Sequence, residues 1–188
     1  MDLLGILTAF GLSASSGLNA YIPLLVVALL GRFTNLIVLK APWDTLTSWW
    51  IIALLVVLSL VEFFVDKIPA VNHANDIIQT FIRPAAGAIA FAASSNVFGE
   101  MHPVLALALG LLVAGGVHTV KAAAIRPVVT ATTGGAGNVP VSMAEDAIAA
   151  VISVLSVVVP VLIACLLIIL TSLIVWWIWR RARNQARA

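Results

Sequence analysis

Three basic side chains lie inside long apolar stretches of this 188-residue chain, and two of them directly precede a proline. The pairs are Arg83-Pro84 and Arg126-Pro127, and the third basic residue is Lys121. Charged side chains at membrane depth usually face a protein interior or a water-filled cavity. Proline suits the first turn of a helix, where free N–H groups and the helix dipole favour anions. We therefore interpret Arg83, Lys121 and Arg126 as an anion-binding group at the starts of two half-helices.

Acidic and imidazole side chains could supply the counter-charges. Glu62 and Asp66 are at positions i and i+4, so a continuing helix would place both on one face. His118 lies on the same stretch as Lys121. Carboxylates and imidazoles suit a proton relay or a divalent cation, but their spacing here matches no specific metal motif. We expect Glu62, Asp66 and His118 to act as counter-charges or a proton relay, with no resident metal and no cofactor.

A purely structural role for the arginines is the alternative interpretation. Each guanidinium could extend its polar tip to a nearby interface, or pair with an acidic side chain of the same chain. The acidic residues available for such pairs are Glu62, Asp66, Asp76 and Glu145.

Motifs for nucleotide binding and for nucleophilic catalysis are missing from the sequence. The Gly134–Gly137 stretch is not followed by the Lys-Ser/Thr of a P-loop, and no strand precedes it. Ser13, Ser15 and Ser16 have no local His or Asp partner. We therefore expect the protein not to be an enzyme.

The composition is that of a membrane protein. Hydrophobic residues make up 62% of the chain and charged residues only 10%. Soluble domains are about half apolar and about a quarter charged, so much of this surface needs lipid as its solvent. We predict an all-α polytopic integral membrane protein in which residues 1–188 form one transmembrane domain.

The first hydrophobic segment, Leu3–Gly31, is uncharged but interrupted in its middle. Ser13–Asn19 is small and polar, and Leu3–Leu12 alone is too short for a hydrocarbon core that needs about 20 helical residues. Irregular backbone at membrane depth is tolerated only inside protein or beside water. We expect this segment to be broken or re-entrant, with Ser16 and Asn19 in the interior as part of the binding site.

Four more hydrophobic segments follow, which gives about five in all; they are Trp49–Phe64, Ile77–Phe98, Val104–Ala131 and Ala147–Trp179. The last is longer than a bilayer, so Pro160 is expected to kink or divide it. Ser142 and Glu145 before it have the spacing of a capping box. The small residues of Ala85–Ala93 favour close helix packing and would also suit a homodimer.

The basic residues near the C-terminus predict the orientation. Residues 179–188 carry several arginines directly after a belt of tryptophans, Trp176, Trp177 and Trp179. The positive-inside rule places such a tail in the cytoplasm, so we expect the bacterial inner membrane and a lipid partner rather than nucleic acid. The N-terminus lacks the basic region of a signal peptide, and the lone Cys165 allows no intrachain disulfide.

Weak internal matches suggest a duplication. At an offset of 43, Ile82-Arg83-Pro84 aligns with Ile125-Arg126-Pro127, and at an offset of 104, Pro23 aligns with Pro127. Proline-interrupted apolar segments at corresponding places in two halves are typical of transporter sites. An internal, inverted repeat is therefore one interpretation.

Several polar stretches together resemble a known family; they are Gly11–Tyr21, Glu62–Pro69, Thr80–Ala88, His118–Gly135 and Glu145-Asp146. The chain resembles a widespread family of small multipass membrane proteins of bacteria and plastids, catalogued only as a domain of unknown function. The resemblance covers most of the chain. It implies a multipass membrane fold and supplies no activity.

Three functional hypotheses follow from these observations. The leading one is a transporter or channel for an ion or a small anionic solute, with its site at discontinuous helices. The second is a non-transporting scaffold or partner subunit whose charges form structural salt bridges. The third is a metal- or proton-linked carrier that uses Glu62, Asp66, His73 and His118.

Overall fold

The computed structural model describes residues 3–67, 69–98 and 101–185, and within these ranges every regular element is helical. The side chains of His73, Asp76 and Cys165, which the sequence analysis named, lie outside the described part of the chain. In chain order the elements are α1 (Leu3–Leu18), α2 (Tyr21–Phe33), η1 (Trp43–Thr47), α3 (Trp49–Val65), α4 (Pro69–Phe98), α5 (Pro103–Val120), η2 (Lys121–Ile125), α6 (Arg126–Thr133), α7 (Asn138–Val158) and α8 (Pro160–Gln185).

Three of the helical stretches are long and apolar enough to cross a membrane: Ile77–Ser95, Pro103–Thr133 and Asn138–Val158. Shorter apolar helices accompany them, among them Trp49–Val65 with 17 residues. Large aliphatic side chains such as Leu54, Val57 and Leu60 are exposed on the outside of α3. An exposed apolar face of this extent is what a helix in contact with lipid requires.

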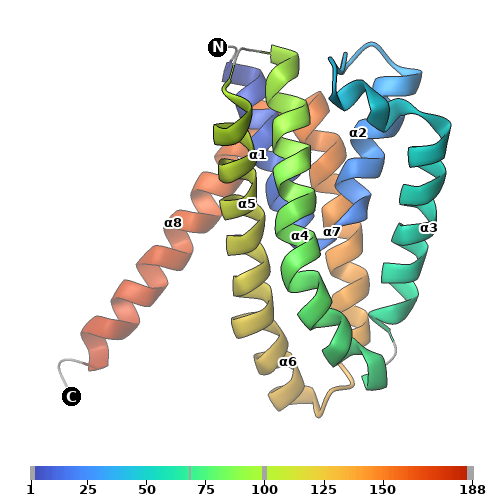
Figure 1. The fold of residues 1–188 in the computed structure, drawn as a ribbon. Helices are drawn as coiled ribbons and strands as arrows, with labels where there is room; N and C mark the ends of the chain where they lie inside the picture. The colour runs from blue at the N-terminus through green and yellow to red at the C-terminus, as the bar shows by residue number, and fades with distance from the viewer. Residues whose placement is uncertain (1–2, 68, 99–100, 186–188) are drawn as a thin grey trace.

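The helices run side by side in one bundle, apart from the last (Figure 1). From the upper end, α1 descends and α2 returns upward, so the two form a hairpin whose tip lies inside the bundle. Helices α3, α4, the α5–α6 unit and α7 then run alternately down and up. The last helix, α8, leaves the bundle at an angle and runs toward the lower end.

Helix α1 lies at the centre and packs against α4, α5 and α7. Its hydroxyls bond to carbonyl oxygens of neighbouring helices: Thr8 to Ser156, Ser13 to Gly110, and Ser15 to Ala149, at 2.9, 2.8 and 2.7 Å. These bonds satisfy polar groups where lipid and water are both excluded. They explain why the polar stretch of α1 is buried.

Small residues allow α4 and α5 to approach closely. A Cβ added at Gly110 would lie 2.5 Å from the carbonyl oxygen of Gly87, and one added at Gly17 would lie 2.6 Å from that of Ala114. The alanines of α4 that follow Gly87 are buried, with Ala90, Ala92 and Ala93 fully so. The prediction that Ala85–Ala93 makes protein contacts is therefore confirmed.

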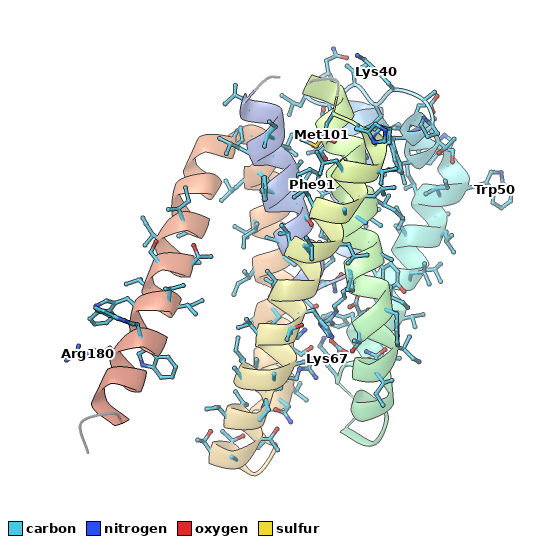
Figure 2. All side chains as sticks on the ribbon, turned by 60° about the vertical axis from the view of Figure 1, so that its left-hand side comes forward. Lys40, Trp50, Lys67, Phe91, Met101 and Arg180 are labelled. Atoms are coloured by element: carbon cyan, nitrogen blue, oxygen red, sulfur yellow. The ribbon has the colours of Figure 1, made fainter. Side chains whose placement is uncertain are left out.

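The bundle has an apolar upper half and a charged lower half. Phe91 packs edge-on against Phe10, at 5.1 Å between ring centroids, and belongs to an apolar cluster with Ala9 and Ala106. Figure 2 shows Phe91 in the upper half and Lys67 in the lower half, whereas Trp50 points away from the bundle. The ionisable side chains that enter the interior gather at the tip of the α1–α2 hairpin.

One predicted interruption is displaced, and the half-helix starts predicted at Pro84 and Pro127 are absent, since Pro103–Thr133 is also one continuous helical stretch. The first segment is helical as far as Leu18 and breaks at Asn19-Ala20, not across Ser13–Asn19, because the serine hydroxyls find acceptors without leaving the helix. Helix α4 continues through Pro84, so the prediction of a half-helix starting there is wrong. Packing of α4 on α1 and α5 outweighs the one hydrogen bond that the proline removes.

The prediction at Pro160 is confirmed, and the capping-box prediction is wrong. Helix α7 ends at Val158 and α8 begins at Pro160, so the long apolar run is two elements. Helix α7 begins at Asn138, before the expected N-cap Ser142, because Gly134 and Gly135 adopt positive φ values and turn the chain early. Ser142 and Glu145 are therefore inside the helix and face the interior.

Candidate functional site

A buried guanidinium, Arg83 of α4, contacts two carboxylates, that of Glu62 in α3 and that of Asp66 at its C-cap. Its Nη2 donates to Glu62 Oε1 at 2.9 Å and its Nε to the same oxygen at 3.3 Å. The same Nη2 lies 3.5 Å from Asp66 Oδ2. The side chains of Arg83 and Glu62 are both inaccessible to solvent. Arginine suits such positions because its five donors have a fixed geometry and it stays charged.

The tip of the α1–α2 hairpin meets this pair. The main-chain N–H of Ala20 donates to the Glu62 carboxylate, at 3.2 and 3.4 Å to its two oxygens. Asn19 Oδ1 accepts from the N–H groups of Tyr21 and Ile22, and Asn19 Nδ2 donates to Asp146 Oδ1 at 2.9 Å. A carboxylate is thus placed at the positive end of the α2 dipole, together with a guanidinium.

Lys121 sits on the other side of the same break. Its Nζ donates to the carbonyl oxygen of Leu18, the last residue of α1, at 3.0 Å and lies 2.8 Å from Glu145 Oε2. Arg126 Nη2 lies 3.5 Å from Asp66 Oδ2 and 3.6 Å from Glu145 Oε2. The two basic groups of this stretch therefore share Glu145.

A π-helical turn, Lys121–Ile125, makes the side chains of Lys121 and Arg126 point in a similar direction. An α-helix turns by about 100° per residue, so residues five apart point about 140° away from each other. A π-helix turns by about 82° per residue and brings the same two positions to within about 50°. Pro127 has no N–H to offer the carbonyl of Ala123, and the wider turn directly before it accommodates that loss.

His118 adds a neutral imidazole to the group. Its Nδ1 is 3.4 Å from Arg83 Nη1 and its Nε2 is 3.2 Å from Thr80 Oγ1. Because a guanidinium can only donate, Nδ1 accepts and the ring proton belongs on Nε2, where it faces Thr80. His118 therefore accepts a hydrogen bond from Arg83.

Asp66 is the most connected carboxylate of the site. Asn75 donates to its Oδ1, and Ser142 donates to its Oδ2 at 3.2 Å. Arg83 and Arg126 approach the same Oδ2 from α4 and α6. Asp66 thus connects the C-terminal end of α3 with α4, α6 and α7.

Charges of the two signs balance among the described members of this network. Four acidic and four basic side chains take part: Glu62, Asp66, Glu145 and Asp146 against Lys67, Arg83, Lys121 and Arg126. Lys67 closes the edge of the network, with Nζ 3.3 Å from Asp146 Oδ2 and 2.8 Å from the Phe63 carbonyl oxygen. Such balance lets buried charges persist in a medium of low dielectric constant.

Residues 6–180 match the family described as a domain of unknown function, DUF4126. The chain belongs to the DUF4126 family. The resemblance drawn from its polar stretches is therefore confirmed. No curated protein and no solved structure matches the chain.

The structure of this DUF4126 chain brings together most of the side chains that the sequence singled out. Asn19, Arg83, Lys121 and Arg126 meet at the hairpin tip, with Glu62, Asp66 and His118 among them. Ser16 is buried too, but its hydroxyl donates to the Leu12 carbonyl oxygen within α1. The pairing of the arginines with Glu62, Asp66 and Glu145, which the structural alternative named, is also present.

Lys67, Glu145 and Asp146 were not among the predicted site residues. The sequence had named Glu145 as part of a capping box and as a possible partner of an arginine. Their signal was available: Glu145 and Asp146 are the last charges before a long uncharged run. Charges at that position either cap a helix or enter a polar interior, and only tertiary structure separates the two.

Metal ligation has no geometric support in the described part of the DUF4126 chain. Among the described residues no group of three His, Cys, Asp or Glu side chains could hold a metal ion. Arg83 donates both to Glu62 and to His118, so a guanidinium occupies the place where a shared metal would have to bind.

Proposed function

We propose that this DUF4126 protein transports or conducts a small ion or small anionic solute, with its site at the tip of the α1–α2 hairpin. The observation that carries the proposal is the convergence of Arg83, Lys121 and Arg126 on a helix break inside an apolar bundle. Buried charges beside unwound backbone are typical of ion and substrate sites in membrane transporters.

The hairpin is proposed to be re-entrant. Helix α1 has 16 residues and α2 has 13, which correspond to about 24 and 20 Å at about 1.5 Å per residue. Neither crosses a hydrocarbon core of about 30 Å, and both have their outer ends at the upper face in Figure 1. The break would then lie within the membrane, in the lower half of the bundle, close to one surface.

Glu62 marks the place where an anion would bind. Its carboxylate takes the hydrogen bonds of Ala20 N and Arg83 that a small oxyanion would otherwise accept. A solute carboxylate or inorganic anion could enter this position only if Glu62 moved aside or took up a proton. This supports an anion pathway in which Glu62 is the internal competitor.

The basic C-terminal tail bears on the orientation of the chain in the membrane. With α8 ending at the lower face and Arg180 beyond its tryptophans, the C-terminus is proposed to be cytoplasmic and the membrane to be the bacterial inner membrane. The whole chain would form one transmembrane domain without enzymatic activity, and the α1–α2 hairpin is its discontinuous element.

A scaffold or partner subunit is the second candidate, because the four acidic and four basic side chains cancel and each basic side chain has an acidic partner. Under this alternative the network holds the helices together and no solute enters. Substituting a charged residue of the network would then change the stability of the protein, and neither the wild type nor the variant would show ion flux.

Flux into proteoliposomes separates the two candidates. We would load vesicles with dyes for protons, potassium and chloride, and measure nitrate and acetate entry by light scattering. The proposal predicts flux of at least one ion above that of empty vesicles, reduced by Arg83→Gln and unchanged by Arg32→Gln, since Arg32 is exposed. Wild-type vesicles that match empty ones for every ion would refute it and favour the scaffold.

A further inference from the structure

The ammonium group of Lys121 lies between two oxygens of the kinds that bind cations. They are the Leu18 carbonyl at 3.0 Å and Glu145 Oε2 at 2.8 Å. Leu18 ends α1, so its carbonyl lies at the negative end of the helix dipole. The side chain of Lys121 is only 2% exposed and that of Glu145 only 9%.

Carbonyl oxygens at the C-terminal ends of broken helices coordinate monovalent cations in membrane transporters. The Glu145 carboxylate supplies a charged oxygen beside such a carbonyl. The ammonium group is a compact point charge with three donors on a flexible stem. It can therefore fill such a position, whereas the planar fork of Arg126, 3.6 Å from Glu145 Oε2, stays at its edge.

Glu145 offers more acceptor capacity than its neighbours use. Its Oε1 is buried and accepts no hydrogen bond, although Lys121 and Arg126 approach its Oε2. A buried acceptor left open is unfavourable unless something with positive charge or a donor can reach it. The oxygens at this position thus outnumber those that the lysine satisfies.

We propose that Leu18 O and the Glu145 carboxylate form a monovalent-cation site whose resident cation is the tethered ammonium group of Lys121. An alkali ion or a small primary ammonium ion binds there when that group is removed. The protein then needs no free sodium or potassium at this position. The inference does not depend on solute transport, because it concerns occupancy and is tested by binding.

Other charges around the ammonium group favour a single positive charge. Arg83 and Arg126 lie on α4 and α6 and repel a second cation, while Glu145 on α7 attracts the first. A divalent ion would add charge that the balanced network does not compensate. The chemical class expected is therefore Na⁺, K⁺ or an ammonium ion of methylamine size.

Thermal unfolding of the purified full chain tests the site. Wild type and Lys121→Ala are melted in chloride salts of sodium, potassium, methylammonium and choline at matched ionic strength. The wild-type Tm should be the same in all four. The Tm of Lys121→Ala should show a saturable upward shift with at least one small cation relative to choline, whose quaternary ammonium is bulkier than the removed group and has no N–H to donate.

Two more variants make the assay specific. Glu145→Gln added to Lys121→Ala should abolish the shift, and Lys40→Ala, which removes an exposed lysine, should behave as wild type. A folded Lys121→Ala with equal Tm values in all salts would overturn the inference. So would a Lys121→Ala protein that stays unfolded even with small cations, or a saturable sodium shift in wild type that Glu145→Gln removes.

Discussion

Replacing Arg83 by methionine should destabilise the protein more than any other single change of a basic residue. The substitution keeps a long side chain and removes the donors that reach Glu62 at 2.9 and 3.3 Å, together with the contact to Asp66 at 3.5 Å. Glu62 would keep only the Ala20 N–H at 3.2 Å. Breaking a buried pair by removing one partner costs about 3–5 kcal/mol, roughly a thousandfold in the folding equilibrium.

The assay is reversible unfolding in mixed micelles of dodecyl maltoside and SDS, followed by tryptophan fluorescence. Arg32→Met is the matched control, because Arg32 is exposed and donates to the Thr47 carbonyl oxygen at 2.8 Å. This substitution should lower the free energy of unfolding by less than about 1 kcal/mol. The double variant Glu62→Met with Arg83→Met should be more stable than the sum of the two single losses predicts, by about 1–3 kcal/mol. The buried pair would be refuted if Arg83→Met lowered the free energy of unfolding no more than Arg32→Met does. It would also be refuted if the effects of Glu62→Met and Arg83→Met were strictly additive.

Three further changes test packing, the network edge and the π-turn. Gly110→Ala should lower the Tm, because its Cβ would lie 2.5 Å from the Gly87 carbonyl oxygen, whereas Gly116→Ala, with nothing within 4 Å, should raise stability by about 1 kcal/mol through helix propensity; equal Tm values would contradict this. Lys67→Met should cost only about 1 kcal/mol in the micelle assay, because Lys67 lies at the edge with 16% of its side chain exposed; a loss equal to that of Arg83→Met would be unexpected. Deleting Ala123 should leave the Tm nearly unchanged, because the flanking basic residues then lie about 40° apart on a regular α-helix. Inserting an alanine at the same point should lower the Tm. A lower Tm for the deletion variant than for the insertion variant would contradict the helical register assigned to the π-turn.

The chain's composition made the charged network predictable in outline. In a chain with only 10% charged residues, buried basic groups at Arg83 and Arg126 have few acidic partners to choose from. The sequence therefore predicted both the convergence and most of its members. It also predicted the buried small-residue face of α4, because alanine and glycine allow neighbouring helices to approach closely.

The finer geometry depended on tertiary contacts that a single sequence does not encode locally. Ser13 sits in a helix, not in a break, because its hydroxyl finds the Gly110 carbonyl oxygen on α5. Pro84 stays within α4 because the packing of α4 on α1 and α5 outweighs the hydrogen bond that the missing N–H removes. The π-turn at Lys121–Ile125 changes the register by one residue, and a helical periodicity read at 3.6 residues per turn misses it.

Glu145 shows how a local pattern can mislead. Its spacing from Ser142 fits a capping box, yet the helix starts earlier and both side chains point into the network. The competing signal was the context, since a carboxylate next to a long uncharged run has to find a counter-charge if it enters the bundle.

Labelling from the two sides of the membrane tests the central claim, that a re-entrant hairpin carries a helix break to the ionic network. In a Cys165→Ser background, single cysteines replace Leu4, Phe33 and Arg180, which are all exposed. An impermeant maleimide should label the first two from the same side and Arg180→Cys from the opposite side. Labelling of Leu4→Cys and Phe33→Cys from opposite sides would show that the segment spans the membrane and would contradict the account.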